Sequence, residues 1–190
     1  MQASAAWFGH PFDADAARAA LDSACAELAD GEPHRVRLAL RRDGSFAVQT
    51  GVLAPLTEPV RLLLSTEPVR SDDLFLRHKT SIRARYDAAW RAAERQGAFD
   101  TLFFNERDEL TEGGRSNVLV RVGERWYTPP LSSGVLPGVM RAVLLDDPDW
   151  RVIECPISRE VLLRAQEIVV CNALRGVLRA TLGSEPPQKR

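Results

Sequence analysis

The sequence lacks the features that mark disulfide-rich, zinc-binding, secreted or membrane-spanning proteins. Its 190 residues include three cysteines, Cys25, Cys155 and Cys171, which have neither CxxC spacing nor a histidine cluster near them. This pattern argues against a disulfide framework and against a zinc site. The N-terminus has no basic start followed by a long apolar core, and no apolar run approaches the length of a membrane-spanning helix. We therefore expect a protein of the reducing cytoplasm, with no metal and no membrane partner.

An excess of charge of one sign is also lacking. The formal net charge is −1, with 27% charged and 45% hydrophobic residues, which is ordinary for soluble globular proteins. Since a nucleic-acid surface needs clustered basic residues, we expect no nucleic-acid partner and interpret the scattered arginines as solvated surface. A chain of this length can bury a core and is expected to form one or two small domains.

Lysine is scarce. Of the 25 Lys and Arg residues, only Lys79 and Lys189 are lysines, and Lys189 lies close to the C-terminus. An arginine stays protonated, whereas a lysine amine can lose its proton and form a Schiff base with an aldehyde. Lys79 is therefore the candidate for covalent chemistry, and the alternative is a leftover surface lysine.

Two glycine-containing segments are further candidates. Glu112 lies in Thr-Glu-Gly-Gly-Arg-Ser-Asn, just before an apolar strand, and Gly138 opens an apolar helical run after Leu136-Pro137. Free N–H groups at a helix start bind phosphate, and a glycine lets the anion approach closely. Taken singly, the first segment is typical of an ordinary hairpin and the second of an ordinary helix start.

Apolar periodicity predicts both helices and paired strands. The helices are expected at 13–31, with Asp13 and Gly31 as caps, within 74–97, and at 138–145 and 158–165. The strands are expected at 36–40, 46–48, 60–65, 99–104, 118–122, 126–128, 151–155 and 167–171. Because strict strand–helix alternation is missing, the fold class is α+β, or α/β with antiparallel strands.

Two prolines mark a domain boundary. Pro55 and Pro59 bracket a predicted linker between two expected strands. The expected division is a small N-terminal domain at 1–55 and a second domain at 56–190, with a disordered Pro-rich tail after residue 183.

Several motifs in order resemble one family. They are Arg77-His78-Lys79-Thr80, Tyr86-Asp87, Glu112-Gly113-Gly114-Arg115-Ser116-Asn117, Leu136-Pro137-Gly138-Val139-Met140-Arg141 and Cys171-Asn172-Ala173-Leu174-Arg175-Gly176. Together they resemble the class IV aminotransferases, the type IV pyridoxal-phosphate enzymes, and within them most closely 4-amino-4-deoxychorismate lyase, which also occurs fused behind para-aminobenzoate synthase component I. The resemblance covers nearly the whole chain.

The resemblance implies a two-domain type IV fold, a homodimer, and pyridoxal 5'-phosphate between the domains. It implies that Lys79 holds the cofactor as an imine and moves a proton, and that Glu112 faces the pyridine nitrogen. The implied phosphate cradle is Gly138, Val139, Met140, Asn172 and Ala173. Ser116 and Asn117 are expected to support the loop near the cofactor, and Arg115 or Arg175 to meet a substrate carboxylate. Tyr86 is expected in the core.

The function implied by the resemblance is cleavage of 4-amino-4-deoxychorismate into 4-aminobenzoate and pyruvate, a step of folate synthesis. The substrate is thus a small molecule with amino and carboxylate groups. One alternative is a branched-chain or D-amino-acid aminotransferase on the same scaffold. Another is a non-catalytic remnant or a partial domain of a larger synthase.

Two departures from the family pattern stand out. Ala173 occupies a position where many relatives carry a hydroxyl group. The strand pair and the phosphate-binding arginine helix that open the family fold have no counterpart before Met1. From these we expect a truncated N-terminal domain and weakened cofactor binding.

Overall fold

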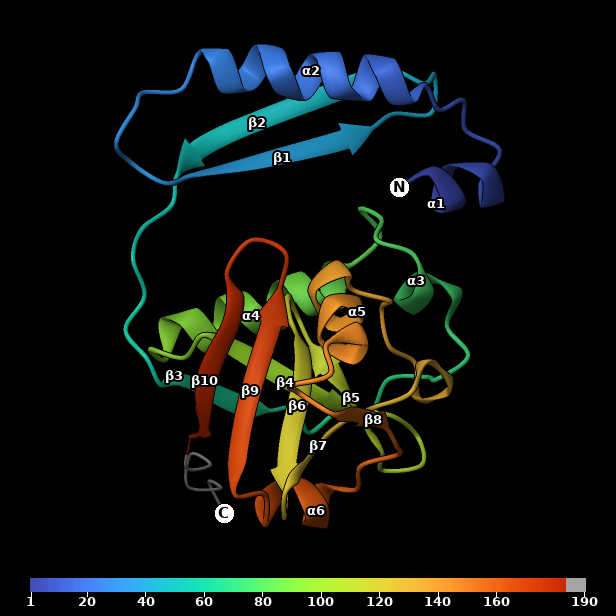
Figure 1. The fold of residues 1–190 in the computed structure, drawn as a ribbon. Coiled ribbons are helices and arrows are strands. Elements are labelled where there is room, and N and C mark those ends of the chain that lie inside the picture. The colour runs from blue at the N-terminus through green and yellow to red at the C-terminus, as the bar shows by residue number, and fades with distance from the viewer. Residues whose placement is uncertain (184–190) are drawn as a thin grey trace. The chain divides into compact units, whose positions relative to one another are not determined.

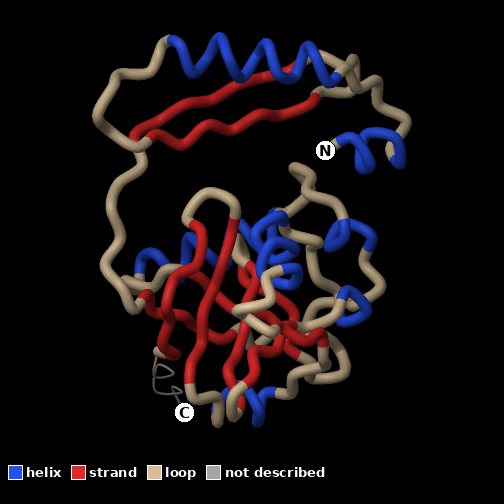
Figure 2. Tube along the Cα trace, viewed as in Figure 1, coloured by secondary structure: helices blue, strands red, loops and turns tan. Residues whose placement is uncertain are grey.

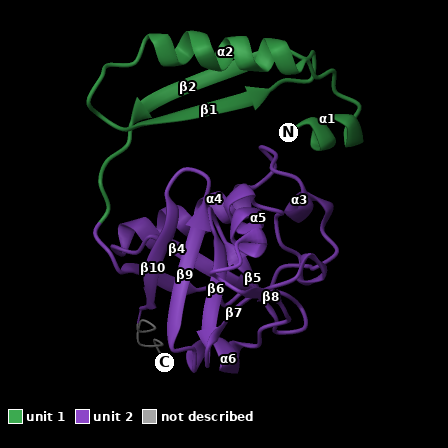
Figure 3. Cartoon of the chain, viewed as in Figure 1, with its two compact units in different colours: residues 1–56 green, residues 57–190 purple. Residues whose placement is uncertain are grey.

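The computed structural model describes residues 1–183, so the expected disorder after residue 183 lies outside the described residues. The chain divides into two compact units, Met1–Leu56 and Thr57–Arg190 (Figure 3). Within the described residues, no helix is long and apolar enough to cross a membrane.

The first unit places helix α2 against a two-stranded antiparallel sheet (Figure 1). Its elements are α1 (Gln2–Trp7), α2 (Ala14–Ala26), β1 (His34–Leu40) and β2 (Phe46–Val52). The predicted turn at Asp43-Gly44 is confirmed: Ser45 donates its N–H to Asp43 Oδ1 at 2.9 Å, and Gly44 has a φ of 85°. A positive φ of this kind favours glycine.

The caps of α2 were predicted half correctly. Asp13 caps the start, because its carboxylate accepts hydrogen bonds from Asp15 N and Ala16 N at 2.9 and 3.0 Å. The helix ends at Ala26, five residues before the expected cap Gly31, which lies in the following turn. The physical reason is that Leu28 donates its N–H three residues back, to Cys25 O, which tightens the chain and ends the helix early.

The second unit is built on one eight-stranded mixed sheet. The strands are β3 (Val60–Leu64), β4 (Asp100–Phe104), β5 (Leu110–Gly113), β6 (Asn117–Val122), β7 (Arg125–Thr128), β8 (Val152–Glu154), β9 (Glu167–Asn172) and β10 (Gly176–Leu182). Their spatial order is β5-β4-β3-β10-β9-β6-β7-β8, and the sheet curls as a half-barrel (Figures 1 and 2). Strand β3 pairs in parallel with β10 and β4, whereas β6, β9 and β10 pair antiparallel. The mixed α/β class with antiparallel strands is confirmed.

Two of these strands were not predicted. Strand β5 contains Glu112 and Gly113, from a polar, glycine-rich segment whose composition predicts a turn. It forms because Leu110 and Gly113 pair with β4 across a register shift. No element was assigned to 176–182, yet this segment lies between β3 and β9 and pairs with both. In each case the partner strand is distant in sequence, so local pattern alone does not reveal it.

The second unit also contains five short helices among its described residues, and the loops next to them carry several of the candidate site residues. They are α3 (Leu74–Arg77), α4 (Ala84–Arg95), the 3₁₀ helix η1 (Leu131–Ser133), α5 (Val139–Asp146) and α6 (Arg159–Leu163). The helix expected within 74–97 is α4, and the short helix α3 precedes it. The loop between them carries Lys79 and begins at His78, which is extended. Ser158 caps α6 as predicted, but that helix ends at Leu163 rather than Ala165.

The sheet packs on both faces. Strand alternation divides β6 between a cluster that contains Val118 and Val120 and a second cluster that contains Leu119. The second cluster includes Leu144 of α5 and Cys171 of β9. This packing holds α5 against β6 and β9.

Candidate active site

Glu112 is a buried carboxylate near the end of β5. Its Oε2 accepts hydrogen bonds from the backbone N–H of Leu136 at 2.9 Å and from Nδ2 of Asn117 at 3.2 Å. The same Asn117 amide donates to Leu136 O at 3.0 Å. One network therefore joins β5, the start of β6 and the segment that leads into α5.

The surroundings of Glu112 shift its protonation. Burial raises the pKa of Glu112 to about 8, while the N–H of Leu136 and the positive charges of Lys79 and Arg83 act in the opposite direction. An acid that titrates near neutral pH is typical of a functional site. A cationic group placed against this carboxylate would favour its ionised form.

Lys79 lies in the exposed loop between α3 and α4. Its positive charge acts on the Glu112 carboxylate, which brings these two predicted site residues within electrostatic reach of each other. The loop continues into Arg83, whose guanidinium donates to Gly114 O and, at 2.8 Å, to Asp87 Oδ1. Arg83 thus ties the loop that carries Lys79 to the segment that carries Glu112.

The start of α5 has free backbone N–H groups and lies very close to Asn117. Gly138 is the N-cap, and no side chain of the described residues caps this helix. The N–H groups of the first turn, which include those of Val139 and Met140, have no partner four residues earlier, so they can receive an anion. A Cβ on Gly138 would lie 2.0 Å from Asn117 Oδ1, so only glycine lets α5 begin this close to Asn117.

The segment before α5 is held by a second carboxylate. Glu109 Oε2 accepts hydrogen bonds from Ser133 Oγ and Asn105 Nδ2, both at 2.9 Å, and from the guanidinium of Arg107 at 2.8 Å. The hydrogen bond from Arg107, with burial opposing it, lowers the pKa of Glu109 to about 2. This network fixes the 3₁₀ turn three residues before Leu136, the donor to Glu112.

The turn between β9 and β10 contains Asn172 and Ala173. Asn172 Oδ1 accepts from the N–H groups of Leu174 and Arg175 at 3.0 and 2.8 Å, and its Nδ2 donates to Arg115 O at 3.1 Å. Asn172 therefore ties its own turn to the turn between β5 and β6, and Ala173 is exposed beside it.

Two predicted site residues have other contacts. Ser116 is buried and donates its hydroxyl to Asp100 Oδ2 at 2.7 Å. The Arg115 guanidinium lies over the rings of Trp90 and Phe99, 4.9 and 4.4 Å from their centroids, and donates to Phe99 O. The Arg115 side chain is thus engaged within the protein.

Two residues near this site were not predicted. Arg83 and Asp100 contact the Glu-Gly-Gly-Arg-Ser-Asn segment directly, and Asp100 had a signal, because it is a lone acid beside an apolar strand run. Tyr86 is buried against Phe103 as expected. Its hydroxyl, however, is buried with no hydrogen-bond partner among the residues that the structure describes. Burial, and next the charge of Glu112, raise the pKa of this hydroxyl.

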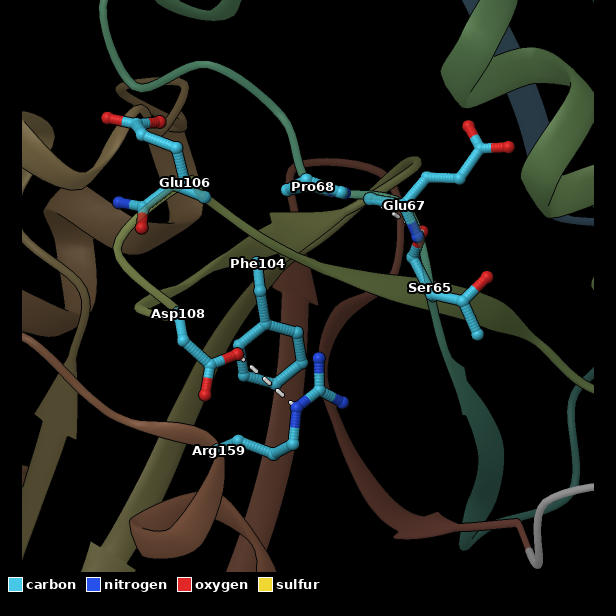
Figure 4. Close-up of a pocket in the computed structure, with 9 residues that line it drawn as sticks. Ser65, Glu67, Pro68, Phe104, Glu106, Asp108 and Arg159 are labelled. Carbon is cyan, nitrogen blue, oxygen red and sulfur yellow. Dashed lines mark hydrogen bonds and ion pairs between the residues drawn. The ribbon is translucent and has the colours of Figure 1, made fainter.

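A separate cavity of about 230 Å³ has a different character (Figure 4). There the guanidinium of Arg159 lies over the Phe104 ring and pairs with Asp108 at 3.4 Å. Its other charged lining groups, Glu67 and Glu106, are acidic, and none of the predicted site residues lines it. The candidate site is therefore the region around Glu112 and not this cavity.

Comparison with known proteins assigns the chain to a family. The model of the family described as "Amino-transferase class IV" matches residues 1–182. The chain belongs to the class IV amino-transferase family. The resemblance stated from the motifs is thereby confirmed, and class IV enzymes typically depend on pyridoxal phosphate.

The relatives of this chain include proteins named as aminotransferases and proteins named as aminodeoxychorismate lyases. A Mesorhizobium loti crystal structure, provisionally named an amino-acid aminotransferase, is 35% identical with a TM-score of 0.87; the match covers 96% of this chain and 87% of that one. A protein provisionally named aminodeoxychorismate lyase, from Schizosaccharomyces pombe, is 27% identical over 80% of this chain and 68% of its own length.

A third relative supports the fold. A hypothetical Mycobacterium tuberculosis aminotransferase in PLP-bound form is 22% identical, with a TM-score of 0.68 over 88% of this chain and 66% of that chain; at this identity it supports the fold alone. The truncated N-terminal domain is not confirmed and stays a prediction.

Proposed function

We propose that this class IV chain binds pyridoxal 5'-phosphate and cleaves 4-amino-4-deoxychorismate into 4-aminobenzoate and pyruvate. The observation that carries the proposal is the Glu112 network, in which a buried acid with a pKa near 8 is aimed by Leu136 N and Asn117 and feels the charge of Lys79. The provisional name of the S. pombe relative supports the lyase reaction.

The residues present fit this cofactor. A buried carboxylate suits a protonated pyridine nitrogen, because an opposite charge favours the ionised acid. The buried hydroxyl of Tyr86, close enough to Glu112 to feel its charge, is a donor that still lacks an acceptor among the described residues. The first turn of α5 offers N–H groups to a phosphate, and Lys79 supplies the amine for covalent attachment.

The roles of the residues follow from these contacts. When bound, pyridoxal phosphate supplies an electron sink for the carbon that bears the substrate amine. Lys79 would hold the cofactor through its amine and, with substrate bound, would take the proton from that carbon. The bond from the ring to the enolpyruvyl oxygen would break with it, so that the ring becomes aromatic and the side chain leaves as enolpyruvate. Lys79 would return its proton to the methylene carbon of enolpyruvate, which yields pyruvate. Glu112 would keep the pyridine nitrogen protonated. Arg175 would bind a carboxylate of the substrate.

The second candidate is an amino-acid aminotransferase, which the name of the M. loti structure favours. The two activities differ in what they need. A lyase releases pyruvate from 4-amino-4-deoxychorismate with no added keto acid, whereas an aminotransferase needs a keto acid as amine acceptor.

The experiment is an assay of purified protein with cofactor and 4-amino-4-deoxychorismate, in which lactate dehydrogenase reports pyruvate. Release of pyruvate without a keto acid, and its loss in Lys79→Ala, is the expected result. Turnover that appears only with an added keto acid would assign the aminotransferase instead. No turnover and no visible absorption band with added cofactor would mean a non-catalytic chain.

A further inference from the structure

Asp100, the first residue of β4, is a fully buried carboxylate that has no role in the proposed chemistry. Its Oδ1 accepts hydrogen bonds from Thr101 N at 2.8 Å and Gly114 N at 2.9 Å. Its Oδ2 accepts from Arg115 N at 3.0 Å and Ser116 Oγ at 2.7 Å. Three of these four donors belong to the turn that joins β5 to β6.

The glycine pair of that turn is shaped around the Asp100 carboxylate. A Cβ on Gly113 would lie 2.3 Å from Oδ2, and a Cβ on Gly114 would lie 3.0 Å from Oδ1. Neither glycine has a positive φ, so space rather than backbone conformation requires them. The Gly-Gly of the motif therefore makes room for a protein carboxylate, where glycines in such a segment are often taken to admit a ligand.

The same turn carries the groups of the candidate site. Glu112 directly precedes Gly113, and Asn117 directly follows Ser116. Asn172, from the β9–β10 turn, donates its amide to Arg115 O at 3.1 Å. Three site residues from three strands are thus attached to one four-residue turn, and Asp100 binds three residues of that turn.

We propose that Asp100 is a positioning residue that fixes the 113–116 turn and, through it, the orientation of Glu112 toward Leu136. It also aligns Asn117 and Asn172 on the same turn. The proposal deepens the proposed function, because it gives Asp100 a part in holding the acid that would face the cofactor. We call the four hydrogen bonds that Asp100 accepts the Asp100 clamp. Its effect on Leu136 can be measured in protein that holds no cofactor.

The decisive variant is Asp100→Asn, which keeps the shape of the side chain. Each carboxylate oxygen accepts from a backbone N–H of the turn, so an amide must turn its NH₂ toward one of them and leave that donor without an acceptor. The turn should loosen, Glu112 should shift, and the bond from Leu136 N should weaken.

The measurement is amide hydrogen exchange in cofactor-free protein. The protection factor of the Leu136 amide should fall by about tenfold in Asp100→Asn, the effect of one buried hydrogen bond. The matched control is Thr101→Val, which removes the 3.3 Å hydrogen bond to Ala89 O from the next residue of the same strand. It should lower stability and leave the protection of Leu136 within about twofold, since successive strand residues face opposite sides.

A milder variant covers the case in which Asp100→Asn does not fold. Ser116→Ala removes only the hydroxyl donor to Oδ2, so the Leu136 amide should lose protection in the same direction and by less. With cofactor, both variants should lower kcat more than Thr101→Val does.

Leu136 protection unchanged from wild type in a folded Asp100→Asn protein, or unchanged in Ser116→Ala when only that variant folds, would overturn the proposal. If wild-type protein fails to bind pyridoxal phosphate while Leu136 responds as expected, the proposed function fails and the clamp stands.

Discussion

Gly138 and Asn117 approach each other so closely that a Cβ on residue 138 would lie 2.0 Å from Asn117 Oδ1. Asn117 is also the amide that donates to Glu112 and to Leu136 O. Asn117 therefore connects the start of α5 to Glu112, and the three form one closely packed unit.

Gly138→Ala should disrupt this unit. The added methyl must displace Asn117, and overpacking of this kind costs about 1–3 kcal/mol of unfolding free energy. Gly51→Ala is the matched control, because its Cβ would meet nothing within 4 Å and its φ is not positive. Denaturant unfolding of both variants measures the difference. Equal stability of the two variants would show that Asn117 is free to move.

The stability of cofactor-free protein should depend on pH through Glu112. Folding raises the pKa of Glu112 from an ordinary 4.5 to about 8, so the folded state favours the protonated acid. That contribution is fully present below pH 4.5 and is lost as the pH rises through about 8. Each pKa unit corresponds to about 1.4 kcal/mol.

Glu112→Gln isolates this effect, because the amide oxygen can still accept from Leu136 N while the group no longer titrates. Between pH 5 and pH 8.5, wild-type protein should lose more unfolding free energy than Glu112→Gln does, as measured by urea unfolding at each pH. Parallel pH profiles for the two proteins would contradict the raised pKa.

Lys79 should be the site of covalent attachment. Borohydride reduction in the presence of pyridoxal phosphate should label the peptide that contains Lys79, as read by mass spectrometry. Lys79→Ala should remove the label, whereas Lys189→Ala, which changes the other lysine of the chain, should keep it. A label that moves to another residue would show that Lys79 is not the reactive amine.

Glu112→Gln should also slow turnover while the cofactor stays bound. A neutral amide cannot stabilise a protonated pyridine nitrogen, and loss of an electrostatic partner where charge develops costs about 10²- to 10³-fold in kcat. Cofactor affinity and steady-state kinetics together check this. Turnover within a few-fold of wild type would remove Glu112 from the mechanism.

The chain should form a homodimer. Val139 and Val143 are exposed and lie one helical turn apart on α5, so they share one face of the helix, and contiguous exposed apolar surface commonly marks an interface. Light scattering at micromolar concentration should report twice the mass of one chain. A monomer at that concentration would count against the prediction.

The sequence by itself singled out the candidate residues for the chemistry and determined most of the local elements. Lys79 and Glu112 stand out because few side chains can supply a reactive amine or a charge partner, and their motifs occur in a fixed order. The caps at Asp13 and Ser158 and the turn at Asp43-Gly44 were correct because each depends on contacts only two or three residues apart.

The tertiary structure alone decided how those residues are held. Whether Glu112 belongs to a turn or a strand depends on β4, and its pKa depends on burial, which no local pattern encodes. Asp100 reaches the glycine pair from 14 residues away, and Asn172 reaches Arg115 from 57 residues away. Such contacts follow from strand order in the sheet, so they appear only when distant segments pair.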